Sequence, residues 1–215
     1  MRTRPSPWLA PACLAACLAA CAGGPQVPAM PDAPPNALPN PGARPAAMLS
    51  GVFCGDAVLT KRGGRVAERM TVTSRGVAIG DGLMLDQTIR FAGGGTATRR
   101  WTVQPDGPDS YRGTLTGDER VAASGEVRAR VAGDTLRIRY PVAGVPFGRM
   151  EQVLTLRPDG TIANVGAVRV LGVPVRRLAE TITPRPGTPQ PGMDLSEGSP
   201  CSAPERRPEP MDAAP

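Results

Sequence analysis

The sequence contains no histidine, a single lysine (Lys61) and few aromatic residues. The absence of histidine excludes Ser–His and Cys–His nucleophilic pairs and imidazole metal ligands. Lys61 precedes Arg62 in a charged turn, where we expect a solvated ammonium rather than a desolvated nucleophile. There is no G-x-S-x-G elbow, phosphate-binding loop or dinucleotide fingerprint in the required strand-to-helix context. We therefore expect a protein that is not an enzyme and that holds neither a metal nor a cofactor.

Aromatic residues make up 3% of the chain, which is too few for a platform that stacks single-stranded bases. Nucleic acid is therefore not an expected partner. We expect most of the aromatic side chains to lie in the core, and Trp101 and Tyr140 are candidates for lining a ligand cavity. The net charge of +6 comes almost entirely from arginine and would favour contact with anionic lipid.

The N-terminal segment has the features of a secretion signal. Arg2 and Arg4 precede an apolar stretch over residues 8–18 that is too short to span a bilayer. The stretch ends in Leu-Ala-Ala-Cys21, which resembles the bacterial lipobox, whose cysteine is diacylated after cleavage. Cys17 also fits this motif, but Cys21 gives the longer apolar region. We expect a signal peptide over residues 1–20 and a lipid on Cys21 as the only membrane anchor.

Proline-rich segments flank the remaining domain. Residues 21–48 are predicted to form a linker, residues 184–215 a second disordered tail, and residues 49–183 one domain. A lipidated chain of this kind faces the periplasm. Ala22, which follows Cys21, is not the aspartate that favours retention in the inner membrane, so the outer membrane is the preferred location.

Five cysteines are present, and three lie at or before the predicted lipid site. The other two, Cys54 and Cys201, are expected to form a disulfide in an oxidising compartment. Two independent thiols are the alternative. The bridge would tie the C-terminal tail to the first strand of the domain.

The domain has the pattern of antiparallel β structure, because short apolar alternations are separated by glycine-rich and Asp-Gly turns. The predicted strands cover residues 51–60, 65–74, 82–91, 97–104, 110–117, 120–132, 135–142, 149–157, 161–171 and 174–183. A meander of about eight to ten strands favours a barrel closed on itself or a sandwich. We predict an all-β, lipocalin-like barrel.

The turn at Gly133-Asp134 predicts a hairpin with one apolar and one cationic face. Four arginines share the second face, Arg128, Arg130, Arg137 and Arg139. Arg130 is expected opposite Arg137, an unfavourable arrangement unless an anion offsets it. If this face lined the mouth or the lumen, the arginines would bind a lipid phosphate or carboxylate. The alternative is a solvated outer face balanced by nearby acidic residues.

Short motifs spread over residues 50–183 resemble a family of uncharacterised bacterial envelope lipoproteins, catalogued as a domain of unknown function. The motifs are Gly51-Val52-Phe53 with Gly55, Asp81-Gly82 with Leu83 and Leu85, Arg100-Trp101 with Asp106-Gly107, Tyr111-Arg112-Gly113, Tyr140, Glu151-Gln152-Val153-Leu154, Asn164-Val165, Leu171-Gly172-Val173-Pro174-Val175 and Glu180-Thr181. The resemblance implies a lipocalin-like barrel and an envelope location. It implies no established activity.

Three acidic residues, Glu151, Glu180 and Asp86, could form a carboxylate cluster, although acids along a basic barrel are more often partners of arginines. Asn164 could orient the polar end of a ligand. The leading hypothesis is a non-enzymatic lipoprotein that binds a lipid-like or apolar anionic molecule. An envelope scaffold with a filled barrel is the alternative, and a carboxylate-based enzyme acting on lipid or glycan is the third. An open apolar cavity would favour the first hypothesis, and a packed interior would favour the second.

Overall fold

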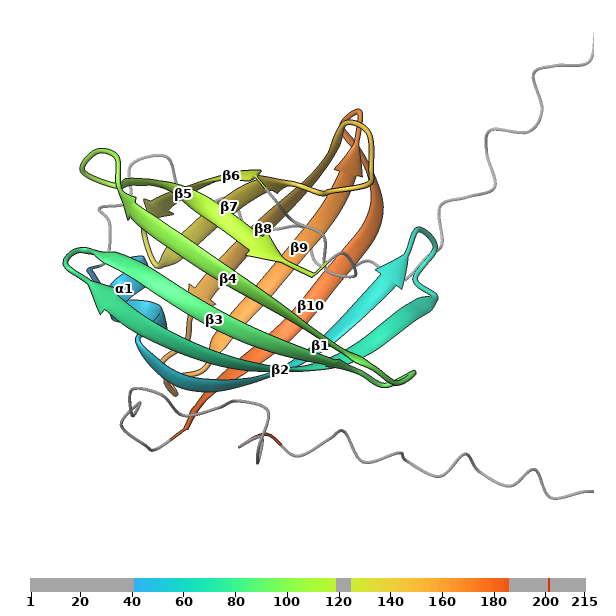
Figure 1. Cartoon of the computed structure of the whole chain (residues 1–215), viewed down its shortest axis with the longest axis horizontal. Helices are drawn as coiled ribbons and strands as arrows, with labels where there is room; N and C mark the ends of the chain where they lie inside the picture. Colours follow the sequence, from blue (N-terminus) through green and yellow to red (C-terminus); the bar gives the residue numbers. More distant parts are fainter. Residues whose placement is uncertain (1–40, 119–124, 186–200, 202–215) are drawn as a thin grey trace, which may run out of the picture.

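Ten antiparallel strands close into a barrel in the computed structural model, which describes residues 41–118, 125–185 and 201. The strands are β1 (Gly51–Lys61), β2 (Val66–Ile79), β3 (Gly82–Phe91), β4 (Thr96–Pro105), β5 (Ser110–Gly117), β6 (Gly125–Ala132), β7 (Thr135–Pro141), β8 (Gly148–Leu156), β9 (Ile162–Val170) and β10 (Val173–Arg185). Each strand pairs with the next, and β1 also pairs with β10 (Figure 1). The predicted all-β meander with barrel closure is thus confirmed.

Some of the predicted strand boundaries agree with the structure, and others differ. The ranges 82–91 and 110–117 match β3 and β5, whereas β2 continues to Ile79, five residues beyond its predicted end at 74. The signal peptide, Cys17, Cys21 and most of both proline-rich tails lie outside the described residues. The predicted strand over 120–132 is described only from Gly125 onward.

Alternating side chains separate the interior of the barrel from its outer wall, because successive residues of a strand point to opposite faces. The core consists of the apolar residues at every second position, such as Leu83 and Leu85 on β3 and Val127 and Val131 on β6. The intervening residues face outward. This pattern determines which polar side chains enter the lumen.

One end of the barrel is closed by a short helix. A 3-10 turn, η1 (Pro41–Ala43), leads into α1 (Pro45–Leu49), whose Met48 and Leu49 are buried in the core (Figure 1). The carbonyl oxygen of Leu49 lies where a Cβ on Gly76 would be, so β2 needs glycine at this contact. These helices extend the folded unit beyond the predicted boundary at residue 49. In the described part of the chain, no helix is long and apolar enough to cross a membrane.

A disulfide joins Cys54 of β1 to Cys201, 147 residues apart. Cys201 is buried, and Cys54 lies on the side of β1 opposite the inward-facing Phe53 and Ala57. The bridge therefore fixes a C-terminal residue to the outer wall, as the number and positions of the cysteines suggested.

Replacing Cys54 and Cys201 together with serine should lower the free energy of unfolding, by about 5 kcal/mol at most, because the open chain gains conformational entropy when unfolded. Urea denaturation followed by circular dichroism measures the loss. Reduction of the unsubstituted protein should produce a similar shift, and should leave the double variant unchanged. Equal stability of the oxidised and reduced protein would contradict the prediction.

Candidate functional site

The barrel contains a cavity of about 570 Å³ on the side away from α1. Most of its lining is apolar and comes from many strands, including Leu59, Met70, Ile89, Phe91, Val168 and Leu178. A second cavity of about 50 Å³ lies toward α1, where Pro45 and Leu49 line it. Volumes of roughly 300–1,000 Å³ are typical of sites for small organic ligands. The larger of these two cavities inside the barrel is therefore the candidate site.

Polar side chains form a floor between the two cavities. Arg99, Gln152 and Glu180 line both of them, so they lie at the boundary. With neighbouring polar groups they make up what we call the floor cluster, defined as Ser74, Gln87, Arg99, Trp101, Tyr140, Gln152, Asn164 and Glu180. An apolar chamber with a polar floor suits a ligand that has an apolar body and one polar end.

Gln87 organises one half of the floor cluster. Its Oε1 accepts hydrogen bonds from Arg99 Nε and from Trp101 Nε1, both at 2.7 Å, and its Nε2 donates to Ser74 Oγ at 2.9 Å. Gln87 lies on β3 and Arg99 on β4, where the two residues are direct partners in the sheet. The network satisfies buried polar groups and holds the arginine in one position.

Arg99 carries the positive charge of the floor. Its Cζ lies 5.2 Å from the centre of the Trp101 ring, and the Trp101 and Tyr140 rings meet edge to face with centroids 5.0 Å apart. Burial raises the pKa of Tyr140, although Arg99 opposes the shift, so the phenol stays protonated. Within the described residues no salt bridge joins Arg99 to a carboxylate. The guanidinium interacts with the Tyr140 hydroxyl and, through its charge, with the Glu180 carboxyl, so an anionic ligand would share it with these two groups.

Glu180 and Asn164 form the other half of the floor. Asn164 Nδ2 donates to Glu180 Oε2 at 2.7 Å, and both side chains are buried. Burial raises the pKa of the Glu180 carboxyl, while the Asn164 hydrogen bond and the Arg99 charge lower it to a smaller extent. A raised pKa lowers the fraction of this carboxyl that is charged at a given pH, and so weakens its repulsion of an anion. Gly55, on the neighbouring strand β1, lacks the Cβ that would clash with Glu180 Oε1.

The arginines of the β6–β7 hairpin lie on the outer wall. The predicted register is found, with Arg128 opposite Arg139 and Arg130 opposite Arg137. Val127, Ala129 and Val131 occupy the core, so the period of two turns the arginines outward, and none of the four lines the cavity. The expectation that this face supplies charge to the lumen is therefore wrong.

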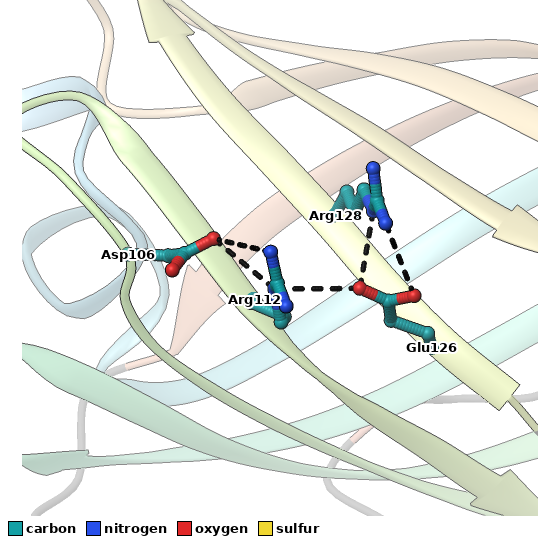
Figure 2. Close-up of polar contacts among 4 residues, drawn as sticks. All are labelled: Asp106, Arg112, Glu126 and Arg128. Carbon is teal, nitrogen blue, oxygen red and sulfur yellow. Dashed lines mark hydrogen bonds and ion pairs between the residues drawn. The ribbon is translucent and has the colours of Figure 1, made fainter.

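Acidic neighbours balance this outer face, as Figure 2 shows for Arg128. Glu126 Oε1 lies 3.1 Å from Arg128 Nε and 3.3 Å from Arg112 Nε, and Arg112 Nη2 lies 3.0 Å from Asp106 Oδ2. Glu151 lies 3.4 Å from Arg139. These exposed pairs offset the repulsion between facing arginines and contribute little else to stability.

The three predicted carboxylates do not converge. Glu180 is inside the barrel, but Glu151 pairs with Arg169 at 3.0 Å on the outer wall, and Asp86 accepts a hydrogen bond from Arg100 at 2.9 Å. The described residues contain no group of three or more Cys, Asp or Glu side chains that could hold a metal ion. Trp101, Tyr140 and Asn164 do lie in the floor cluster.

Sequence reasoning missed Arg99, Gln87 and Gln152. The available signal was a polar residue at an inward position of an otherwise apolar alternation, as in Ala97-Arg99-Trp101. Arg99 and Arg100 are adjacent, and only the register shows that Arg99 faces inward. Convergence of these residues at one depth depends on how the strands are staggered around the barrel.

Comparisons with known proteins agree with this architecture. Residues 31–182 match the model of a family described as "Protein of unknown function (DUF3833)". The chain belongs to this family. Members of DUF3833 have no function in that description, and no curated protein is significantly similar to this chain.

The fold of this DUF3833 chain is also similar to a solved structure, "Crystal Structure of Rv2717c from M. tuberculosis". The TM-score is 0.50 and the sequence identity is 15%, with 69% of this chain and 99% of the other covered. At this identity the similarity concerns the barrel fold alone.

Changing Glu180 to glutamine should make stability less dependent on pH. The pKa of Glu180 in the folded state is raised above the ordinary value of 4.5 that holds in the unfolded state. Between these two pKa values the unfolded state has lost the proton and the folded state still holds it. The folded protein therefore becomes less stable as the pH rises from 4.5 to the folded pKa. Glutamine cannot ionise but still accepts from Asn164. Thermal unfolding should show Glu180→Gln several degrees more stable at pH 7 and equal to the unsubstituted protein below about pH 4. A constant difference at every pH would contradict this explanation.

Proposed function

We propose that this protein binds, without catalysis, a small amphiphile that has an apolar body and an anionic head group such as a carboxylate. The observation that carries the proposal is the apolar cavity of about 570 Å³ with Arg99 at its floor. The apolar lining would take the body of the ligand, which gains free energy by leaving water. A cavity of this size also disfavours the alternative of a filled scaffold barrel.

The floor cluster supplies the recognition of the head group. Arg99 is held by Gln87 Oε1 through its Nε, by the Trp101 ring and by the Tyr140 side chain, and its guanidinium would bind a carboxylate or phosphate that reaches the floor. The protonated Tyr140 hydroxyl is a second donor in the same cavity. Charge therefore comes from inside the barrel, and the hairpin arginines have no part in it.

Replacing Arg99 with methionine should weaken binding of dodecanoate by about ten- to a hundredfold, because a hydrogen bond to a charged group contributes about 1.5–3 kcal/mol. Isothermal titration of the protein with dodecanoate and with dodecan-1-ol measures the effect. The alcohol lacks the anion, so its affinity should change little. Arg100→Met is the matched control, since Arg100 is the neighbour in sequence that points outward to Asp86.

Two results would count against the proposal. If neither compound binds the unsubstituted protein, the cavity does not take single-chain amphiphiles. If Arg99→Met and Arg100→Met lower dodecanoate affinity equally, the head group is not bound at the floor. Circular dichroism of both variants checks that each remains folded.

The same proposal places the protein in the bacterial envelope, tethered by a lipid on Cys21. The signal-like N-terminus supports this, and the Cys54–Cys201 disulfide is compatible with an oxidising compartment. Metabolic labelling with an alkyne fatty acid in a bacterial host should mark the protein. Cys21→Ser should abolish the label while Cys17→Ser leaves it, and the reverse pattern would assign the lipid to Cys17.

A further inference from the structure

The barrel end opposite α1 exposes large apolar side chains. We call this end the mouth, formed by the β1–β2, β3–β4, β7–β8 and β9–β10 connections (Figure 1). The exposed apolar residues there are Val66, Phe147, Leu171, Val173 and Val175. Phe147 and Leu171 are 77% and 76% exposed, more than any other large hydrophobic side chain of the described residues. Such concentration at one end indicates a surface that meets an apolar partner.

Phe147 and Leu171 lie on neighbouring connections. The residue after Phe147, Gly148, is paired with Val170, which precedes Leu171, so the two tips are adjacent. Both residues have left-handed backbone, with φ of 57° for Phe147 and 48° for Leu171. In the described residues they are the only non-glycine positions with positive φ, and bulky residues rarely adopt this conformation. The fold therefore exposes two large apolar side chains at one point of the mouth.

Basic residues stand beside these tips. Lys61, Arg62 and Arg65 are exposed at the β1–β2 turn, and Lys61 is paired with Arg176 of β10, next to Arg177. Positive charge therefore continues from one connection of the mouth to the next. A surface that combines apolar tips with cations complements an anionic lipid headgroup layer.

Among the residues that the structure describes, the acidic side chains near the mouth do not pair with these cations. Glu151 already contacts Arg139 and Arg169, and Asp118 accepts hydrogen bonds from the Thr98 amide and hydroxyl. Glu68 is half-buried in the cavity lining. The basic residues of the β1–β2 turn are thus left to face outward, whereas Arg176 of β10 is exposed at the mouth and also lines the cavity.

We propose that the mouth docks on an anionic lipid membrane, with Phe147 and Leu171 inserted at the headgroup boundary and the neighbouring lysine and arginines on lipid phosphates. The cavity extends to this end, because Val142, Val145 and Val175 of the mouth line it. A docked mouth would place the cavity opening against the bilayer. Docking does not require that the cavity takes a ligand, so it stands independently of the proposed function.

One tryptophan added to the full chain, at either end of the barrel, tests which end meets the membrane. Phe147→Trp places a reporter on the mouth, and Ile79→Trp places one on an exposed apolar position at the α1 end, 42% exposed in the native chain. The vesicles contain phosphatidylglycerol and phosphatidylcholine with brominated acyl chains. Because both variants share the same N-terminus, any lipid anchor acts equally on them.

The Phe147→Trp emission should move to shorter wavelength and be quenched at least twofold, while the Ile79→Trp reporter should be unaffected. Vesicles of phosphatidylcholine alone should give a much smaller effect. Quenching at position 79, at both positions equally or at neither would overturn the proposal. For each variant, the emission recorded without vesicles is the baseline, and it includes the emission of the native tryptophans.

Charge reversal tests the electrostatic half of the proposal in the Phe147→Trp background. Arg62→Glu with Arg65→Glu should weaken binding to the anionic vesicles by at least tenfold, since both residues are exposed at the mouth outside the cavity lining and each basic residue near such a surface contributes to the attraction. Arg130→Glu with Arg157→Glu is the matched control, because both residues are exposed away from the mouth. An equal loss in both pairs would mean general charge attraction without a docking face and would overturn the proposal.

Discussion

Strand β1 pairs with β10 from Val52 opposite Arg185 to Lys61 opposite Arg176, and this pairing closes the sheet. A closed sheet has no free edge, and it creates an inside that belongs to no single strand. Every side chain is then assigned to the lumen or to the outer wall by its position in the alternation. The cavity, the floor cluster and the charged outer surface all depend on this one constraint.

Closure also explains why polar groups are tolerated inside. A buried hydroxyl, amide or guanidinium costs free energy unless it has hydrogen-bond partners. The barrel brings Gln87 within reach of three such groups and Asn164 within reach of Glu180. Asn164 Oδ1 is buried without a hydrogen-bond partner in the described structure, which leaves the floor with unused capacity for an added polar group.

The two ends of the barrel have different roles. At one end α1 fills the lumen, and the contact of Leu49 with Gly76 allows close packing. At the other end the lining is mostly apolar, with Glu68 and Arg176 as charged exceptions, up to the mouth, where Phe147 and Leu171 are exposed. A chamber closed at one end would admit the proposed amphiphile in one orientation, with its polar end at the floor and its apolar end toward the mouth.

The sequence by itself determined the class of fold, the turn positions and the register of the β6–β7 hairpin, because period-two alternation and Asp-Gly turns are local signals. It also selected Cys54 and Cys201 as the cysteine pair. The tertiary structure decided which charges face the lumen. Arg128 and Arg130 form a conspicuous pattern yet lie outside, whereas Arg99 is one of two adjacent arginines and lies inside. Inside and outside are properties of the closed sheet, and the depth at which side chains meet depends on stagger between strands far apart in sequence.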